Sequence, residues 1–311
     1  MRVAYDAAPL LNPRAGVGHY AAALLEEMLK TTDLEFNLFA VTRAANGDHI
    51  PSNQRVQFVH RRLPARIVVT AWETLGWPSG EVLTGASDVV HGTNFWIPPT
   101  KRSHGIVTIH DLTFLFYPEL CTPQVQRYRW IVPKVLKRVA AVITPTETVK
   151  REVVEHLKFP SDRVFVTLEG VSGHFRGAKP DRQLLTRLGI GSDYLLFSGT
   201  QEPRKNLDRL IQAFADLGDA NLELVITGPR GWGSIDLPEL AHKLGVGDRT
   251  IFCGYLSSAE LAAVMAGATA YVFPSIYEGF GLPPLEAMAA GIPVVAARAG
   301  SMPEILGDAP L

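Results

Sequence analysis

The sequence has little of what would stabilise a small secreted domain or cross a membrane. Its two cysteines, Cys121 and Cys253, exclude a disulfide framework, and no CxxC or His/Cys cluster indicates structural zinc. The longest uncharged stretch, residues 261–277, is interrupted by glycine, proline and serine and is too broken for a membrane span. An acidic residue at position 6 interrupts the first apolar run, so no long signal core is predicted. We expect a reducing, cytoplasmic setting.

The chain also lacks a strong excess of charge of either sign. Its net charge of −1 excludes a strongly basic nucleic-acid binder. With 47% hydrophobic and 20% charged residues, the composition is that of a folded globular protein. A length of 311 residues is typical of two domains.

Short β-type runs alternate with helical patterns along the chain. In the first half, strands are predicted over residues 3–7, 35–41, 88–91, 105–109, 141–144 and 163–167, and helices over 18–30, 122–140 and 146–157. The pattern restarts with strands over 194–197, 222–227, 250–253, 270–273 and 293–296, and helices over 206–217, 237–244, 257–266 and 285–290. This alternation predicts α/β domains with doubly wound, Rossmann-like parallel sheets.

A Gly/Pro/Lys-containing linker near residues 173–181 separates the two halves. We therefore expect an N-terminal domain over 1–175 and a C-terminal domain over 176–311. Two such domains are expected to face a cleft at the carboxyl ends of both sheets, where ligands of this fold class bind.

A first glycine motif, Gly16-Val17-Gly18-His19-Tyr20-Ala21, follows the first strand and opens a helix. It fits a G-x-G-x-x-G/A pattern, which lets a backbone approach a phosphate, although a plain glycine turn has the same form. The preceding loop is long for a dinucleotide turn, and the second strand ends in Thr42 and Arg43 with no acid to hold a ribose. A nicotinamide cofactor is therefore not expected.

Two further loops follow predicted strands of the second half. The string Ser198-Gly199-Thr200-Gln201-Glu202-Pro203-Arg204-Lys205-Asn206 places two cations before a helix, which favours a phosphate or diphosphate. The string Glu278-Gly279-Phe280-Gly281-Leu282-Pro283-Pro284-Leu285-Glu286 is a glycine-rich loop that leads into a helix. We place Glu286 in the first turn of that helix, where it would accept hydrogen bonds from two ribose hydroxyls. A first-turn glutamate favoured by the helix dipole is the alternative.

A His-Asp pair, His110-Asp111, directly follows a buried strand of the first half. This position lies at the carboxyl edge of the predicted sheet. We interpret His110 as a site residue. A structural histidine is the alternative.

These strings resemble the retaining nucleotide-sugar glycosyltransferases of family 4, which have the GT-B fold. The resemblance rests on the spacing E-x(7)-E from Glu278 to Glu286, the string EPRKN, the Gly228-Pro229-x-Gly231-Trp232 turn and Gly300-Ser301-Met302-Pro303-Glu304. The strings around His110 and Arg204 look most like those of bacterial mannosyltransferases, which often use GDP-mannose.

The resemblance implies a role for each matching residue. His110 would contact the donor sugar near its reacting carbon, and Arg204 and Lys205 would bind the diphosphate and stabilise its leaving-group charge. Glu286 would hold the ribose, and Glu278 the donor sugar. The backbones of the remaining donor-binding residues would contact sugar or phosphates: Gly16, Gly18, Gly199, Thr200, Gly279, Phe280, Gly281 and Leu282.

The expected reaction is transfer of a hexose, with retention, from a nucleoside diphosphate sugar to a glycan or lipid-linked sugar acceptor. The resemblance implies a front-face substitution, in which the leaving diphosphate takes the acceptor proton. A carboxylate nucleophile of the kind that retaining glycosidases use is the alternative, with Asp111 as its candidate. No Asp-x-Asp motif is present, so no metal and no cofactor are predicted. A nucleotide-sugar epimerase and a non-catalytic sugar-nucleotide-binding protein are the alternatives. Family members usually continue beyond the string that ends this chain, so closing C-terminal helices are expected to be missing from it.

A basic segment with no acidic residue runs from Arg127 to Arg138 and includes Arg129, Lys134 and Lys137. Aromatic and aliphatic residues lie between these cations. Such a segment can bind an anionic membrane surface, which would place the protein at the inner face of the membrane. We favour an ordinary solvated helix face, with membrane binding as the alternative.

Overall fold

The computed structural model describes residues 1–11, 16–41, 50–61, 63–191 and 193–310. The chain forms two compact units. The first consists of Met1–Phe114 and Gln126–Leu168, and the second of Leu115–Val125 and Glu169–Leu311. The second unit thus contains a short segment from the N-terminal half of the sequence. That the first unit serves the acceptor and the second the donor stays a prediction.

The first unit is built on a seven-stranded parallel sheet in the order β3-β2-β1-β4-β5-β6-β7. Its strands are β1 (Arg2–Asp6), β2 (Glu35–Val41), β3 (Val56–Arg61), β4 (Val89–Gly92), β5 (His104–Thr108), β6 (Ala141–Thr144) and β7 (Val164–Val166). Strand order changes direction between β1 and β4. The predicted doubly wound α/β fold is therefore confirmed for this unit.

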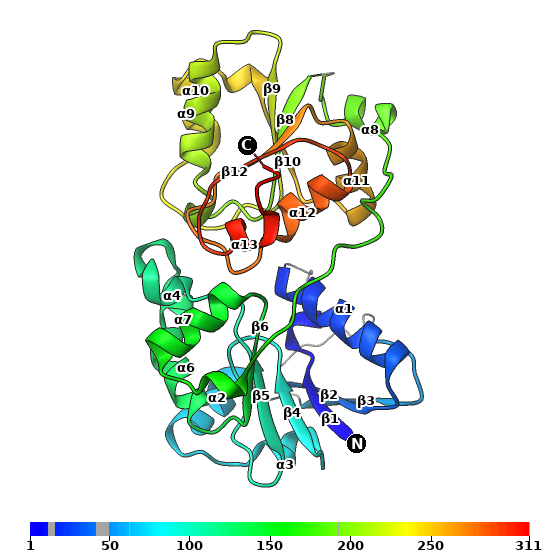
Figure 1. Ribbon diagram of the computed structural model, residues 1–311, viewed down its shortest axis with the longest axis vertical. Helices are drawn as coiled ribbons and strands as arrows, with labels where there is room; N and C mark the ends of the chain where they lie inside the picture. Colours follow the sequence, from blue (N-terminus) through cyan, green and yellow to red (C-terminus); the bar gives the residue numbers. More distant parts are fainter. Residues whose placement is uncertain (12–15, 42–49, 62, 192, 311) are drawn as a thin grey trace. The chain divides into compact units, whose positions relative to one another are not determined.

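Helices flank this sheet, with α1 beside β1 and β2 and with α7 beside β6 (Figure 1). The helices of the first unit are α1 (Gly16–Thr31), α2 (Ala65–Thr74), α3 (Gly80–Thr84), α6 (Tyr128–Leu136) and α7 (Glu147–Leu157), and the short α4 (Thr113–Phe116) has its first two residues in this unit and its last two in the second. Helix α7 begins where predicted because the Thr146 side chain accepts a hydrogen bond from the Val149 N–H.

The single helix predicted over 122–140 is wrong. The chain forms two separate helices there, α5 (Pro123–Gln126) and α6, and α6 ends at Leu136. It ends early because the Ala140 N–H already donates to the Gly105 carbonyl of β5, so the chain has joined the sheet by that point.

The five cations of the basic segment are also not equivalent. Arg138 is partly buried, and its Nη2 donates to the Ile97 carbonyl at 2.9 Å. Arg127 pairs with Glu73 of α2 at 3.3 Å. Arg129, Lys134 and Lys137 are exposed, and no acidic partner is found for them among the residues that the structure describes. The exposed basic charge is therefore smaller than the sequence suggests.

The second unit is built on a five-stranded parallel sheet in the order β10-β9-β8-β11-β12. Its strands are β8 (Tyr194–Ser198), β9 (Glu223–Thr227), β10 (Thr250–Gly254), β11 (Ala270–Phe273) and β12 (Val294–Ala296). Its helices include α8 (Arg182–Arg187), α9 (Leu207–Leu217), α10 (Leu237–Lys243), α11 (Ser258–Ala266), α12 (Leu282–Ala289) and α13 (Met302–Leu306).

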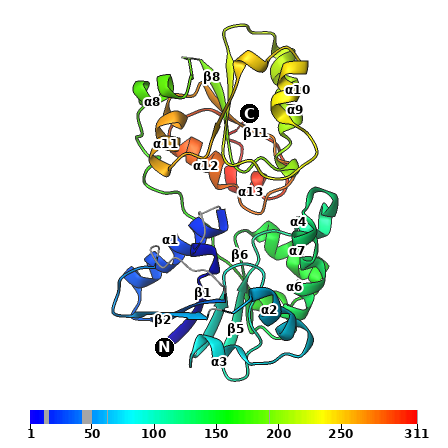
Figure 2. The same cartoon turned by 180° about the vertical axis from the view of Figure 1, so that it is seen from behind.

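Helices α9 and α10 lie on one side of this sheet and α11 and α12 on the other (Figures 1 and 2). The two helix layers bury the central strands β8 and β9, whose Leu196, Leu224 and Val225 are fully enclosed. Strands buried on both faces read as continuous apolar runs, which is why they were recognisable in the sequence. Within the described part of the chain, no helix has the length and apolarity needed to cross a membrane.

Candidate active site

Two buried carboxylates and two cations meet at the carboxyl end of β8. Nη1 of Arg204 lies 2.5 Å from Oε2 of Glu278, and Nζ of Lys205 lies 2.5 Å from Oε1 of the same carboxylate. On its other edge, Arg204 contacts Oε1 of Glu202 through Nη2 at 2.6 Å and Nε at 3.0 Å. Both oxygens of Glu278 and both edges of the Arg204 guanidinium are therefore engaged.

The electrostatics of this quartet follow from burial and pairing. Burial alone would raise the pKa of Glu278, but Arg204 and Lys205 outweigh it and bring the pKa down to about 2. Burial lowers the pKa of Lys205, and the nearby Glu278 charge opposes that shift. Because both oxygens of Glu278 have a cationic partner within hydrogen-bonding distance, this carboxylate remains ionised despite its burial.

Hydrogen bonds to backbone carbonyls fix the loop that carries the two cations. A short 3-10 turn, Pro203–Lys205, ends at Asn206 in the left-handed conformation, and Nδ2 of the Asn206 side chain donates to the Pro274 carbonyl at 3.1 Å. The Ile276 N–H donates to the Arg204 carbonyl, and Arg204 Nη1 donates to the Tyr277 carbonyl. These contacts hold the loop after β8 against the loop after β11.

The glycines of the sequence motifs allow close backbone approach around this quartet. A Cβ on Gly228 would lie 2.1 Å from the Gly199 carbonyl oxygen. A Cβ on Gly300 would lie 2.5 Å from the Glu278 carbonyl oxygen, and the Ser301 N–H donates to that same oxygen. Any larger residue at either position would push the loops apart.

The predicted position of Glu286 in the first turn of a helix is wrong. Helix α12 begins at Leu282 after Gly281, which adopts a left-handed conformation, so Glu286 lies beyond the first turn. Pro283 and Pro284 fit inside the helix start because the first N–H groups of a helix have no partner there. The helix dipole therefore does not explain Glu286. Burial raises its pKa to about 7.

A cavity of about 250 Å³ opens at the carboxyl ends of β9 and β10. It is lined by residues of the loops after β8 and β9 and of the end of β10, including Gln201, Gly228, Arg230, Gly231, Trp232 and Gly254. The sequence pointed to it only through the Gly228-to-Trp232 turn, because its walls come from segments that are far apart along the chain. The carboxyl edge of a parallel sheet is where such folds bind ligands.

The segment Leu115–Val125 packs within the second unit. The rings of Phe116 and Tyr117 each lie 5.8 Å from the ring of Tyr277, and Trp232 Nε1 donates to the Leu120 carbonyl at 3.0 Å. Tyr277 directly precedes Glu278. Local sequence patterns do not indicate these contacts, since the rings that meet lie far apart along the chain.

The other predicted catalytic residue, His110, lies in the first unit. It follows β5, and its Nε2 lies 2.8 Å from the Thr93 carbonyl oxygen. The rings of Tyr20 and Phe95 meet the imidazole edge-on at 4.8 and 5.9 Å. Oδ1 of the neighbouring Asp111 accepts from the Thr113 N–H at 2.9 Å and so shapes the turn into α4.

Gly16 and Gly18 belong to the first turn of α1 and not to the loop before it. A Cβ on Gly16 would meet nothing within 4 Å, while Gly18 is buried. Most of the preceding loop, residues 12–15, lies outside the described residues. The structure thus brings Arg204, Lys205 and Glu278 together in the second unit, with Gly199 and Gly279–Leu282 nearby. His110, Gly16 and Gly18 belong to the first unit.

The sequence matches two families over most of its length. "Glycosyl transferase 4-like domain" matches residues 15–168, and "Glycosyl transferases group 1" matches residues 187–310. These two matches correspond closely to the two sheets.

Similar proteins agree with this assignment. The chain is 29% identical to O-antigen chain mannosyltransferase B of Escherichia coli, over 100% of this chain and 86% of that protein. It is 26% identical to the O-antigen chain mannosyltransferase RfbU of Salmonella typhimurium, over 73% of this chain and 61% of that protein. The structure of HepE from Anabaena in complex with UDP-glucose shares the fold, with a TM-score of 0.68, 19% identity and coverage of 98% and 82% of the two chains. The chain belongs to the group 1 (family 4) glycosyltransferases, retaining hexosyltransferases of the GT-B fold that transfer a sugar from a nucleotide sugar.

Proposed function

We propose that this glycosyltransferase moves mannose from GDP-mannose to a glycan or lipid-linked sugar acceptor, with retention of configuration. The observation that carries the proposal is the convergence of Arg204 and Lys205 on one carboxylate at the carboxyl end of β8. Two fixed cations at this edge suit a departing diphosphate. Mannose is supported by the two O-antigen mannosyltransferases among the relatives.

Arg204 and Lys205 bind the diphosphate of the donor in this proposal. Their side chains are already held in place by Glu202 and Glu278, so binding requires little reorganisation. The backbones of Gly199 and Thr200 border the same position. Charge-assisted hydrogen bonds to the phosphate oxygens strengthen as the diphosphate acquires charge in the transition state.

The nucleoside is bound by Glu286 and the cavity beside Trp232. Burial raises the pKa of Glu286 to about 7 because its ionised carboxylate is poorly solvated. Hydrogen bonds from hydroxyl donors stabilise that ionised form, and two adjacent ribose hydroxyls supply two such donors. The cavity of about 250 Å³ accommodates the base. Glu278 and the backbone of Gly279, Phe280, Gly281 and Leu282 border the donor sugar.

The first unit contributes His110, which contacts the sugar near its reacting carbon, and Gly16 and Gly18, which let the backbone approach donor and acceptor. In the reaction, an acceptor hydroxyl oxygen bonds to the anomeric carbon on the face from which the diphosphate leaves. The bond between that carbon and the phosphate oxygen breaks, and the leaving phosphate oxygen takes the hydroxyl proton. Arg204 and Lys205 stabilise the charge that develops on it.

The enzyme is also proposed to contact anionic lipid through α6 and the neighbouring α2. Support comes from exposed cations on and next to α6 together with exposed Trp130, which is 68% accessible. Leu75 and Trp77, just after α2, are 74% and 66% accessible, and the Arg127–Glu73 ion pair joins the two helices. Basic and aromatic side chains of this kind suit a lipid surface, whereas an ordinary solvated helix face predicts no vesicle binding.

A thermal-shift panel of GDP-, UDP-, ADP- and dTDP-sugars tests the donor assignment. A bound donor raises stability by RT ln(1 + [L]/Kd), about 2.7 kcal/mol at a hundredfold excess over Kd. We expect the largest shift with GDP-mannose, and a larger shift with another nucleotide would contradict the assignment. Product analysis with and without acceptor separates transfer from epimerisation and from binding alone.

A further inference from the structure

A second buried carboxylate lies at the carboxyl edge of the other sheet. Asp6 ends β1, and the order of the seven strands changes direction between β1 and β4. At such a switch point the loops after two neighbouring strands run to opposite faces of the sheet and leave a crevice that binds ligands. The position of Asp6 is therefore one where this fold class places ligand-binding side chains.

The contacts of Asp6 leave its carboxylate largely unused. The side chain is 8% accessible, and its Oδ1 accepts from the Ala8 N–H at 3.0 Å. In the part of the chain that the structure describes, no cation pairs with Asp6 and its Oδ2 accepts no hydrogen bond. A buried carboxylate normally has several donors or a cation, so Asp6 has capacity for donors from a ligand.

Asp6 is connected to His110 through Thr93. The Thr93 hydroxyl donates to the Asp6 carbonyl at 3.2 Å, and the Thr93 carbonyl oxygen lies 2.8 Å from Nε2 of His110. The end of β1 and the loops after β4 and β5 therefore meet at one edge. A ligand beside Asp6 is thereby close to the residue assigned to the reacting carbon.

Aromatic rings border this edge. The ring of Phe95 lies 4.9 Å from that of Tyr128 and 5.9 Å from that of His110. Phe95 adopts φ of 59°, which is rare for a bulky residue and occurs at sites where surrounding structure imposes it. Burial raises the pKa of Tyr128, and the charge of Asp6 adds to that shift, which places the phenol within electrostatic reach of the carboxylate.

We propose that Asp6 binds a hydroxyl group of the acceptor sugar. This inference rests on the proposed function, in which His110 and the second unit account for the donor. A carboxylate that pairs with no cation of the described residues repels a diphosphate but accepts hydrogen bonds from a neutral polyol. Asp6 thus fits the acceptor and not the nucleotide.

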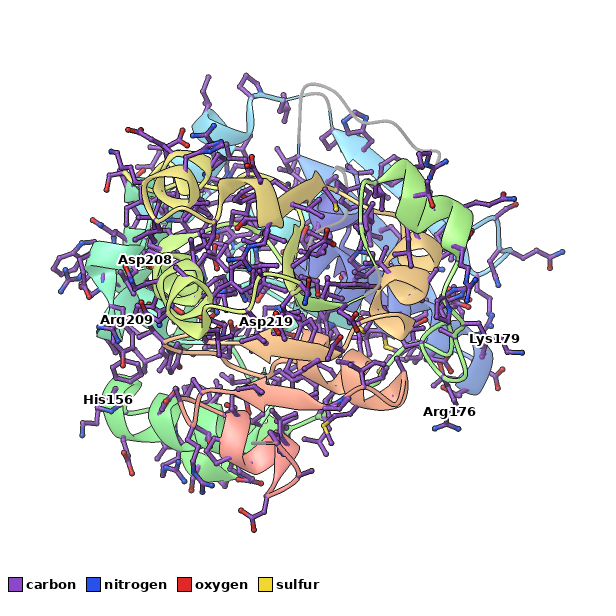
Figure 3. All side chains as sticks on the ribbon, turned by 90° about the horizontal axis from the view of Figure 1, so that it is seen from above. His156, Arg176, Lys179, Asp208, Arg209 and Asp219 are labelled. Atoms are coloured by element: carbon purple, nitrogen blue, oxygen red, sulfur yellow. The ribbon has the colours of Figure 1, made fainter. Side chains whose placement is uncertain are left out.

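The variant Asp6→Asn separates this role from a structural one. An asparagine keeps an oxygen for the Ala8 N–H but replaces the charged, unused oxygen by an amide. Asp219 provides a matched control, because its Oδ1 likewise accepts from the N–H two residues on, at 2.9 Å, but its side chain is exposed (Figure 3). Asp219→Asn is expected to behave like the wild type throughout.

Saturation-transfer NMR with methyl α-mannoside, methyl α-glucoside and methyl α-galactoside, recorded with GDP present, measures acceptor-site binding without turnover. We expect at least one glycoside to bind the wild type and to bind Asp6→Asn tenfold or more weakly. GDP affinity should be unchanged, and the melting temperature unchanged or higher.

Equal glycoside affinity in the wild type and Asp6→Asn would overturn the inference, as would the absence of binding by any of the three glycosides to the wild type. A lower melting temperature with unchanged glycoside affinity would assign Asp6 a structural role and also overturn it. The thermal-shift measurement tests the proposed function separately: if GDP-mannose does not raise the melting temperature of the wild-type protein, the proposed function fails and not the role of Asp6.

Discussion

The two units each bury a carboxylate at the carboxyl edge of a parallel sheet, but the two carboxylates have different hydrogen-bond partners. Glu278 is 7% accessible and bonded to two cations, which hold its pKa at about 2. Asp6 is 8% accessible and bonded to one backbone N–H, and burial raises its pKa to about 6. In the proposals made above, the first arrangement supplies cations to an anionic ligand, and the second supplies a hydrogen-bond acceptor to a ligand with hydroxyl groups. The same residue class at the same kind of edge is thus proposed to serve two different chemistries.

The strongest test of the paired arrangement is removal of one cation. Lys205→Ala should lower kcat by several orders of magnitude, because it removes stabilisation of charge that grows in the transition state. Nucleotide affinity should fall less than the rate. Arg209→Ala is the control, since Arg209 is an exposed arginine on α9 (Figure 3). If KM rises while kcat stays at the wild-type value, the cation only binds substrate.

The unpaired arrangement predicts a gain in stability when the charge of Asp6 is removed. The pKa of Asp6 is about 6 in the folded protein and 3.8 for an ordinary aspartate, the value expected in the unfolded chain. Between these two pH values the folded state binds more protons than the unfolded state, so the free energy of unfolding falls as pH rises. At about 1.4 kcal/mol per unit, ionised Asp6 costs up to about 3 kcal/mol above pH 6. Urea unfolding should find Asp6→Asn more stable than the wild type at neutral pH and similar in stability near pH 4. A loss of stability at neutral pH would contradict this account.

Glu286 extends the comparison to a third carboxylate, whose pKa burial raises to about 7. Glu286→Gln should weaken donor affinity about ten- to a hundredfold, because hydrogen bonds to a charged group contribute roughly 1.5–3 kcal/mol each. In the wild type the donor KM should rise as pH falls through about 7, since the carboxylate then becomes protonated. The variant should lack this step, and an unchanged donor KM would reject the ribose assignment.

A smaller effect is expected at the membrane surface. The exposed Lys134 and Lys137 should each contribute about 1 kcal/mol to binding of anionic lipid, and salt should weaken it. Sedimentation with anionic and neutral vesicles measures this, using Lys134→Gln/Lys137→Gln and, as the control on another segment, exposed Lys179→Gln (Figure 3). Equal failure to sediment with both vesicle types would leave α6 an ordinary surface helix.

The smallest expected effect is that of chelation. The diphosphate is assigned to Arg204 and Lys205, and no Asp-x-Asp motif is present, so EDTA should leave activity unchanged. Loss of activity with EDTA and recovery with Mg²⁺ or Mn²⁺ would show that Arg204 and Lys205 do not suffice to bind the diphosphate without a metal ion.

The sequence predicted those features that depend on local patterns. Strands β2, β6 and β11 were predicted with their observed bounds, because buried parallel strands form continuous apolar runs between breaks. Strand β3 was missed, since it contains Gln57, His60 and Arg61 and lies at the sheet edge. Edge strands need less apolar sequence, so their pattern is weak.

The motifs located the candidate site residues, but their partnerships could not be predicted from local spacing. Glu278 and Arg204 are separated by 74 positions, and only the packing of two loops brings them together. Glu202 lies in the EPRKN motif, but the motif gives no sign that its carboxylate pairs with Arg204. Asp6 was included in a strand and gave no motif at all, because its significance depends on strand order and burial.

The most direct test of the central claim follows GDP-mannose by proton NMR in the presence of the enzyme and a mannoside acceptor. We predict release of GDP together with a new α-linked mannosyl product, and neither when Lys205→Ala replaces the wild type. A β-linked product, or transfer from another nucleotide sugar but not from GDP-mannose, would contradict the account.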